Sequence, residues 1–204
     1  MSKENEQEFS LQLLRSGDRA EIARLVDAYS TKIYRLALKM LANPQDAEDV
    51  LQNTFLKAIQ ALPKFEARSS LSTWLYRIAV NESLMLIRRR KPEIDISLKK
   101  DDDESELELT HFSDWYCLPE SELISAEAQE HLDEAVQKLS EKLRVVFILR
   151  DIEKLSIAET SEALEISEAA VKLRLLRARL KLREILSKYY VERLDSEKKD
   201  EKQS

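Results

Sequence analysis

Apolar side chains recur every three to four positions over most of the first ninety residues, which is the spacing of an α-helix that buries one face. Asp18, followed three residues later by Glu21, matches a capping box and predicts the start of a helix over residues 18–40. Asn43 and Pro44 follow that repeat and are typical of a helix end.

Two more helices are predicted in this half of the chain. One covers residues 46–62 and ends where Pro63 interrupts its apolar repeat. The other covers residues 72–90 and ends in a basic run before Pro92. Together these elements predict a compact unit of three or four helices over residues 10–92.

The second half repeats the helical pattern and adds a more specific signal. Ser156 and Glu159 form another capping-box pattern that opens a short helix, and Ser167 caps a longer basic helix after a turn at Glu165. Two helices joined by a tight turn, the second of them basic, are typical of a helix-turn-helix. We predict this motif within a second helical domain, residues 126–190.

Residues 93–125 show no sustained period and contain the acidic run DDDESELELT. We expect a solvated, self-repelling linker, since the run lacks the glycine and alternating ligands of a calcium-binding EF-hand loop. Trp115, Tyr116 and Cys117 form a small apolar island that could dock on a domain or partner. The predicted fold is all-α: two small helical domains joined by a flexible acidic linker, with a charged tail over residues 191–204.

The composition argues against an enzyme that works alone. One glycine, Gly17, cannot build a phosphate-cradling loop, and two histidines with one cysteine are too few for a zinc site of nitrogen and sulfur ligands. No nucleophile, base and orienting group can be assembled from them. We therefore expect no catalytic residue, no metal and no cofactor.

The N-terminus is polar, and no apolar run approaches the roughly 20 residues of a membrane span. A single cysteine fits a reducing compartment, so we expect a cytoplasmic protein without membrane insertion. The net charge of −6 hides an uneven distribution. Residues 10–92 carry 14 Lys and Arg against 8 Asp and Glu, residues 93–125 carry 2 against 11, and residues 126–190 carry 12 of each. The acidic total therefore does not exclude nucleic acid as a partner.

Two basic segments are candidates for binding nucleic acid. The second helix of the predicted helix-turn-helix could lie in the major groove, although a run of charge is also common on a solvated helix face. In the first domain, Phe65, Trp74 and Tyr76 alternate with arginines, a mixture that single-stranded sites use for stacking and for phosphates. Core packing competes with stacking, and we expect at least one of Trp74 and Tyr76 to be mainly core. Asn81 could read a base edge.

Three segments of the chain resemble segments of one known protein family. DAEDVLQNTFLKAIQAL (46–62) is similar to the core-binding helix of the extracytoplasmic-function (ECF) sigma factors, bacterial promoter-recognition subunits of RNA polymerase. FEARSSLSTWLYRIAVNESLMLIRRRK (65–91) resembles their promoter-melting and minus-ten segment, and LSIAETSEALEISEAAVKLRLLRARLKL (155–182) resembles their minus-thirty-five helix-turn-helix. The resemblance covers about residues 10–92 and 126–186, in family order.

The resemblance implies partners and residue roles. The partners would be core RNA polymerase, promoter DNA and an anti-sigma factor. Core polymerase would be bound by Asp46, Asp49, Val50, Gln52, Asn53 and Leu56. The minus-ten element would be bound and melted by Lys64, Phe65, Arg68, Ser69, Trp74, Tyr76, Arg77, Asn81, Arg88, Arg89 and Arg90, with the loop 64–70 holding a flipped base. The minus-thirty-five element would be bound by Lys172, Arg174, Arg177 and Arg179.

Two departures from the family pattern affect the helix-turn-helix. Glu165 stands where many members have glycine, which predicts a more helical or slightly wider turn. Leu173 and Leu176 replace polar residues and form a second apolar stripe with Leu180, which we expect to pack on a neighbouring helix or an inhibitory partner. Two alternatives stay open: a helix-turn-helix regulator that never joins polymerase, and a sigma-like adaptor that docks only on proteins.

Overall fold

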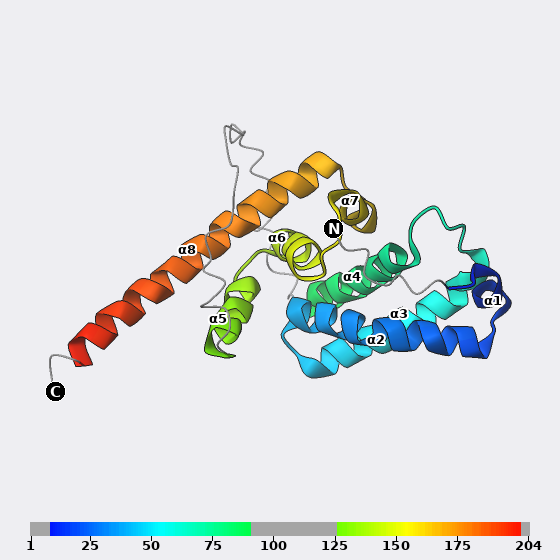
Figure 1. The fold of residues 1–204 in the computed structure, drawn as a ribbon, viewed down its shortest axis with the longest axis horizontal. Helices are drawn as coiled ribbons and strands as arrows, with labels where there is room; N and C mark the ends of the chain where they lie inside the picture. Colours follow the sequence, from blue (N-terminus) through cyan, green and yellow to red (C-terminus); the bar gives the residue numbers. More distant parts are fainter. Residues whose placement is uncertain (1–8, 91–125, 201–204) are drawn as a thin grey trace.

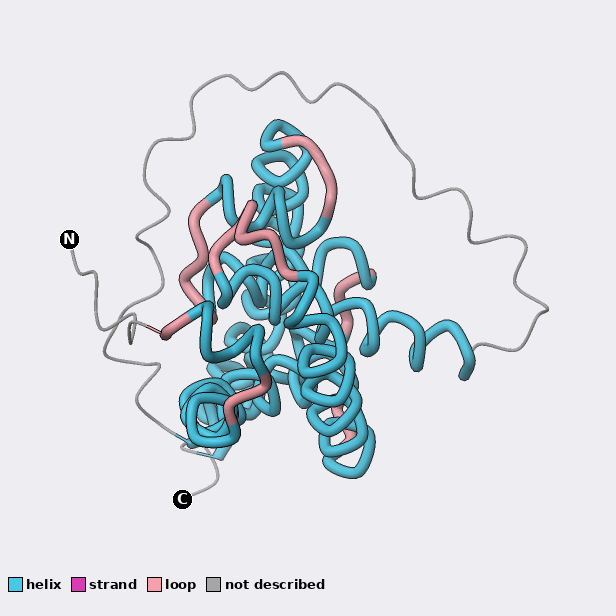
Figure 2. Tube along the Cα trace, turned by 90° about the vertical axis from the view of Figure 1, so that its right-hand side faces the viewer, coloured by secondary structure: helices cyan, strands magenta, loops and turns pink. Residues whose placement is uncertain are grey.

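The computed structural model describes residues 9–90 and 126–200, and helices are the only regular elements in these ranges (Figures 1 and 2). The predicted all-α fold is confirmed. The first helix group contains α1 (Leu11–Ser16), α2 (Arg19–Leu41), α3 (Pro44–Ala61), the 3-10 turn η1 (Leu62–Lys64) and α4 (Leu71–Arg90). The second helix group contains α5 (Ala126–Gln137), α6 (Glu141–Phe147), the π-helical turn η3 (Ile148–Ile152), α7 (Ile157–Leu164) and α8 (Glu168–Asp200). The predicted linker and its apolar island lie outside the described residues.

Local signals explain the ends of α2 and α3. The Asp18 side chain accepts a hydrogen bond from the Glu21 backbone N–H at 2.9 Å, as a cap should. The Glu21 carboxylate does not complete the predicted capping box, because it accepts from the Ser10 N–H at 2.7 Å instead. Helix α3 starts at Pro44, two residues before the predicted start, because a proline without an N–H fits the first turn of a helix.

Helix α1 was not predicted from the sequence. It is only six residues long, too short to show a helical period, but its end signals are clear in the structure. Ser10 caps its N-terminus, and Gly17 ends it in the left-handed conformation at φ 78°. Leu14 is the buried residue of this helix, and α1 packs against η1.

The helix-turn-helix of α7 and α8 forms as its capping residues predict. Ser156 and Glu159 make both hydrogen bonds of a capping box, and Ser167 accepts from the Ala170 N–H at 3.1 Å. The prediction of a more helical turn at Glu165 is wrong, since this residue adopts the left-handed conformation typical of glycine, at φ 54° and ψ 41°. The first part of α8 packs against α5, α6 and α7, and its C-terminal end projects away from the other helices (Figure 1).

The two helix groups share one cluster of buried apolar side chains, with α4 against α7 and the end of α2 against α5, α6 and η3. Glu153, whose side chain is 2% exposed, accepts from the Tyr76 hydroxyl at 2.8 Å and from Arg35 Nε at 3.2 Å. Arg144 of the second group donates to the Met40 carbonyl at 2.7 Å, and Gln137 donates to the Lys39 carbonyl at 2.6 Å. The second group therefore supplies partners for carbonyls at the C-terminus of α2 that α2 itself leaves open. Within the described ranges, no helix combines the length and apolarity needed to cross a bilayer.

Candidate nucleic-acid interface

The segment from the end of η1 to the start of α4 exposes basic side chains. Lys64, the last residue of η1, and Arg68 of the loop are exposed, and Ser69 is half-buried. Arg68 pairs at 2.6 Å with Glu66, which is also exposed. At the far end of the loop, Ser70 accepts from the Thr73 N–H at 3.0 Å and so caps α4. This geometry presents charge to a ligand without burying it in the protein.

All three aromatic residues proposed for base stacking are buried. Phe65, Trp74 and Tyr76 are 7%, 8% and 4% exposed, and the Phe65 and Trp74 rings lie 4.7 Å apart between centroids. We expected at least one of Trp74 and Tyr76 to be mainly core, and both are. The structure contradicts the prediction that these three rings form an open stacking surface, because a ring packed on other side chains offers no face to a base.

Tyr76 also takes part in the contact between the helix groups. Burial, followed by the charge and hydrogen bond of Glu153, raises the pKa of the Tyr76 hydroxyl well above its ordinary value. The phenol therefore stays protonated and donates to the carboxylate. A folded-state pKa above the unfolded value means that this contribution to stability is complete below pH about 10 and is lost as the pH rises further.

Helix α4 carries the remaining candidates, which differ in exposure and in their partners. Asn81, Arg88 and Arg89 are exposed, as the minus-ten assignment requires. Arg90 is exposed as well, but it pairs with Asp46 at the start of α3. Arg77 is one-third exposed and reaches Glu165 of the helix-turn-helix at 3.4 Å.

The proposed polymerase-binding residues of α3 divide into two sets. Asp49, Gln52 and Asn53 are exposed, and Leu56 is an apolar side chain that is 58% exposed. Val50 is fully buried with Ala37 and Ala47, so it cannot face a partner and its assignment is corrected. Asp46 is corrected too, because its backbone N–H bonds to the Asn43 cap and its carboxylate to Arg90.

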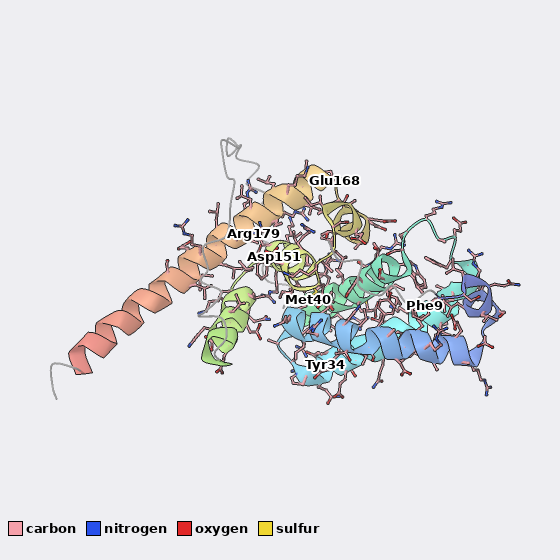
Figure 3. All side chains as sticks on the ribbon, in the orientation of Figure 1. Phe9, Tyr34, Met40, Asp151, Glu168 and Arg179 are labelled. Carbon is pink, nitrogen blue, oxygen red and sulfur yellow. The ribbon has the colours of Figure 1, made fainter. Side chains whose placement is uncertain are left out.

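Helix α8 carries the predicted minus-thirty-five residues, with different surroundings for each. Lys172 is exposed, whereas Arg174 and Arg177 are half-buried. Arg179 donates from Nε and Nη2 to the two carboxylate oxygens of Asp151 at 2.9 and 2.7 Å, and Figure 3 shows the two labelled side chains together. This hydrogen bond raises the pKa of Arg179, while burial opposes it. We correct its assignment, because the guanidinium holds α8 to η3 rather than facing outward.

The structure also brings in residues that sequence reasoning missed. Arg15, Asp151 and Glu153 each bond a residue at least 28 positions away, and no local spacing signals such a contact. The Leu173, Leu176 and Leu180 stripe is half-buried and lies outside the described core clusters. Among the residues that the structure describes, no three His, Cys, Asp or Glu side chains gather as metal ligands would.

Comparisons with known proteins match both helix groups. The family model "Sigma-70 region 2" matches residues 25–93, and "Sigma-70, region 4" matches residues 129–182. The chain is 35% identical over 152 residues to the ECF RNA polymerase sigma factor SigW of Bacillus subtilis, covering 73% of this chain and 80% of SigW. It is 32% identical to the RNA polymerase sigma-H factor of Pseudomonas aeruginosa, covering 76% and 80%. The solved structure of CnrH in complex with the cytosolic domain of CnrY superposes with a TM-score of 0.64 at 25% identity, covering 87% of this chain and 94% of that one.

Proposed function

The chain belongs to the ECF group of RNA polymerase sigma factors, and on this premise we propose how its two helix groups divide promoter recognition. As a sigma factor it binds core RNA polymerase, directs it to promoters and assists their melting. Sigma factors are initiation factors rather than catalytic enzymes, and we propose that this chain has no turnover of its own. Its place of action would be the cytoplasm, with the polymerase.

The first helix group would bind core polymerase and the single-stranded minus-ten element. The exposed side of α3, with Asp49, Gln52, Asn53 and Leu56, supports the polymerase contact. The exposed loop residues Lys64 and Arg68, followed by Asn81 on α4, support the contact with an opened strand. Arg88 and Arg89 extend the same charge and would neutralise phosphates.

The second helix group would bind the minus-thirty-five element as duplex. Helix α8 follows a short capped helix and a tight turn, which is the arrangement that places a helix in the major groove. Lys172, Arg174 and Arg177 remain the candidates for this groove. The observation that carries the whole proposal is the order of two sigma-region matches along one chain, each with exposed basic residues on its surface.

Promoter melting would depend on the polymerase. Opening about ten base pairs at about 1.4 kcal/mol per step costs roughly 14 kcal/mol, and each stacked base returns about 1–3 kcal/mol. With Phe65, Trp74 and Tyr76 buried, few rings are available to supply that return. The remaining free energy would come from polymerase contacts and from phosphate neutralisation by the basic first group.

A protein partner would regulate the chain. CnrH is solved in complex with the cytosolic domain of CnrY, and we propose that this chain also binds a protein partner, which would be an inhibitory anti-sigma factor. The half-buried stripe of Leu173, Leu176 and Leu180 is a candidate contact for it.

Run-off transcription with purified core polymerase tests the proposal. On genomic fragments, adding this protein should produce specific new transcripts that core polymerase alone does not make. Permanganate footprinting should detect open promoter DNA only with holoenzyme. Specific duplex binding by the protein alone, without new transcripts, would favour the regulator that never joins polymerase. Unchanged transcription after substitution of Asn81 and Arg174 would favour the adaptor.

A further inference from the structure

Arg15 joins the short helix α1 to the loop that follows η1. Its Nε and Nη2 atoms both donate to the backbone carbonyl of Phe65, at 3.0 and 2.5 Å, across 50 positions of sequence. Phe65 is the last buried residue before the exposed part of the loop. One guanidinium therefore holds the point at which the loop leaves the core.

The sequence around Arg15 fixes where this guanidinium lies. Leu14 is 1% exposed and anchors α1 in the core. Gly17 reverses the chain in the left-handed conformation, and the Asp18 N–H returns to the Leu13 carbonyl at 3.0 Å. Glu21 of α2 holds the other end of α1 by accepting from the Ser10 N–H. The helix is thus tied at both ends, and in Figure 1 it lies at the end of α2 and α3 from which the loop departs.

The loop itself has few restraints between its ends. Phe65 is held by its ring, which packs on Trp74, and by its carbonyl, which Arg15 binds; Ser70 is held by its cap on α4. Ala67, between them, is exposed and takes a left-handed conformation at φ 57° that alanine disfavours. Apart from the exposed Glu66–Arg68 pair, the contacts described for this loop therefore lie at its two ends.

We infer that Arg15 is a positioning residue for base selection by the loop 64–70, an inference that rests on the proposed contact of this loop with the minus-ten strand. Arg15 lies before residue 25, where the region 2 match begins. Its guanidinium binds the backbone carbonyl of Phe65, so a substitution of Arg15 frees the loop and removes no DNA contact. A freed loop must be ordered on binding any base and rejects a wrong base less well, because discrimination needs groups held in place.

The test uses holoenzyme made from purified core polymerase and the full chain. A pool of single-stranded DNA of randomised sequence is bound, and sequencing of the bound fraction gives the enrichment of the preferred base at each position. Arg15→Gln should lower that enrichment by about fivefold or more at one position. The enrichment for Arg15→Lys should lie between that of the unchanged protein and that of Arg15→Gln, since an ammonium keeps the charge but lacks the planar fork of a guanidinium. Affinity for core polymerase should stay within about twofold for every variant.

Arg19→Gln is the matched control, because it removes the same charge from an exposed position at the start of α2. It should leave the enrichment unchanged, and equal losses in both variants would overturn the inference by showing a general charge effect. Lys64→Ala and Arg68→Ala separate the two proposals. If they weaken strand binding and Arg15→Gln keeps full enrichment, the inference fails alone; if they have no effect, the proposed role of the loop fails. An unchanged thermal midpoint for Arg15→Gln excludes misfolding as the cause of its loss.

Discussion

The two proposed DNA-binding surfaces hold their basic residues in different ways. In the first helix group, Arg68 stands on a loop whose anchoring contacts lie at Phe65 and Ser70, and Lys64 is the last residue of η1 before it. The neighbouring aromatic rings are buried. In the second, the basic residues follow one continuous helix, and Arg179 is bound to Asp151 within the fold. A loop can adapt to a strand taken out of a duplex, whereas a rigid helix suits a groove that already exists. The same residue types thus serve the fold at one position and the surface at another.

The largest expected effect concerns Trp74, a buried residue of the first helix group. Trp74→Ala should destabilise the protein by about 3–5 kcal/mol, because it removes a large packed ring and leaves a cavity against Phe65. Urea unfolding measures this loss. Arg68→Ala, at a side chain that is 85% exposed, should change stability by no more than about 0.5 kcal/mol. If Trp74→Ala kept its stability but lost binding to the minus-ten single strand, the ring would contact DNA and not the core.

A smaller effect is expected at Arg179, where the second group uses a basic residue for its own packing. Arg179→Ala should cost about 1–3 kcal/mol, because Asp151 loses both charge-assisted hydrogen bonds while only 22% exposed. A double-mutant cycle with Asp151→Asn isolates the coupling between the two side chains. Arg183→Ala, at an exposed position of the same helix, is the control. If Arg179→Ala folds as stably as Arg183→Ala but loses duplex binding, the side chain belongs to the DNA surface after all.

Local signals made the helices predictable, whereas contacts between distant residues were not. Capping residues and prolines lie within a few positions of the ends that they mark, so the helix-turn-helix followed from its spacing. Trp74 and Tyr76 lie at helical spacing that suits a core face or an open face equally. The partner of Tyr76 is 77 positions away and that of Arg179 is 28 positions away, so only the folded chain shows which side chains are already occupied.

A change of about 1 kcal/mol is expected at the turn of the helix-turn-helix. Glu165→Gly should stabilise the protein by about that amount, because glycine adopts the left-handed conformation without the strain of a side chain. The lost pair with Arg77 should matter little, since Glu165 is 74% exposed. Glu162→Gly, inside α7, is a control of opposite sign and should destabilise by about 0.5–1 kcal/mol. Thermal unfolding compares them, and destabilisation by Glu165→Gly would show that its side chain has a role that the turn geometry does not reveal.

The smallest effect on stability, and the sharpest test of the comparison, comes from one exposed lysine in each surface. Lys172→Ala and Lys64→Ala should each change stability by no more than about 0.5 kcal/mol, since both side chains are exposed. In holoenzyme, Lys172→Ala should weaken binding to minus-thirty-five duplex and reduce the slope of log affinity against log salt by about 0.9, one phosphate contact. Lys64→Ala should instead reduce the slope for minus-ten single strand by about 0.7. Each variant is the control for the other. If both lysines affected duplex and single strand alike, their charge would act at long range, and the division between a single-strand surface in the first helix group and a duplex surface in the second would be wrong.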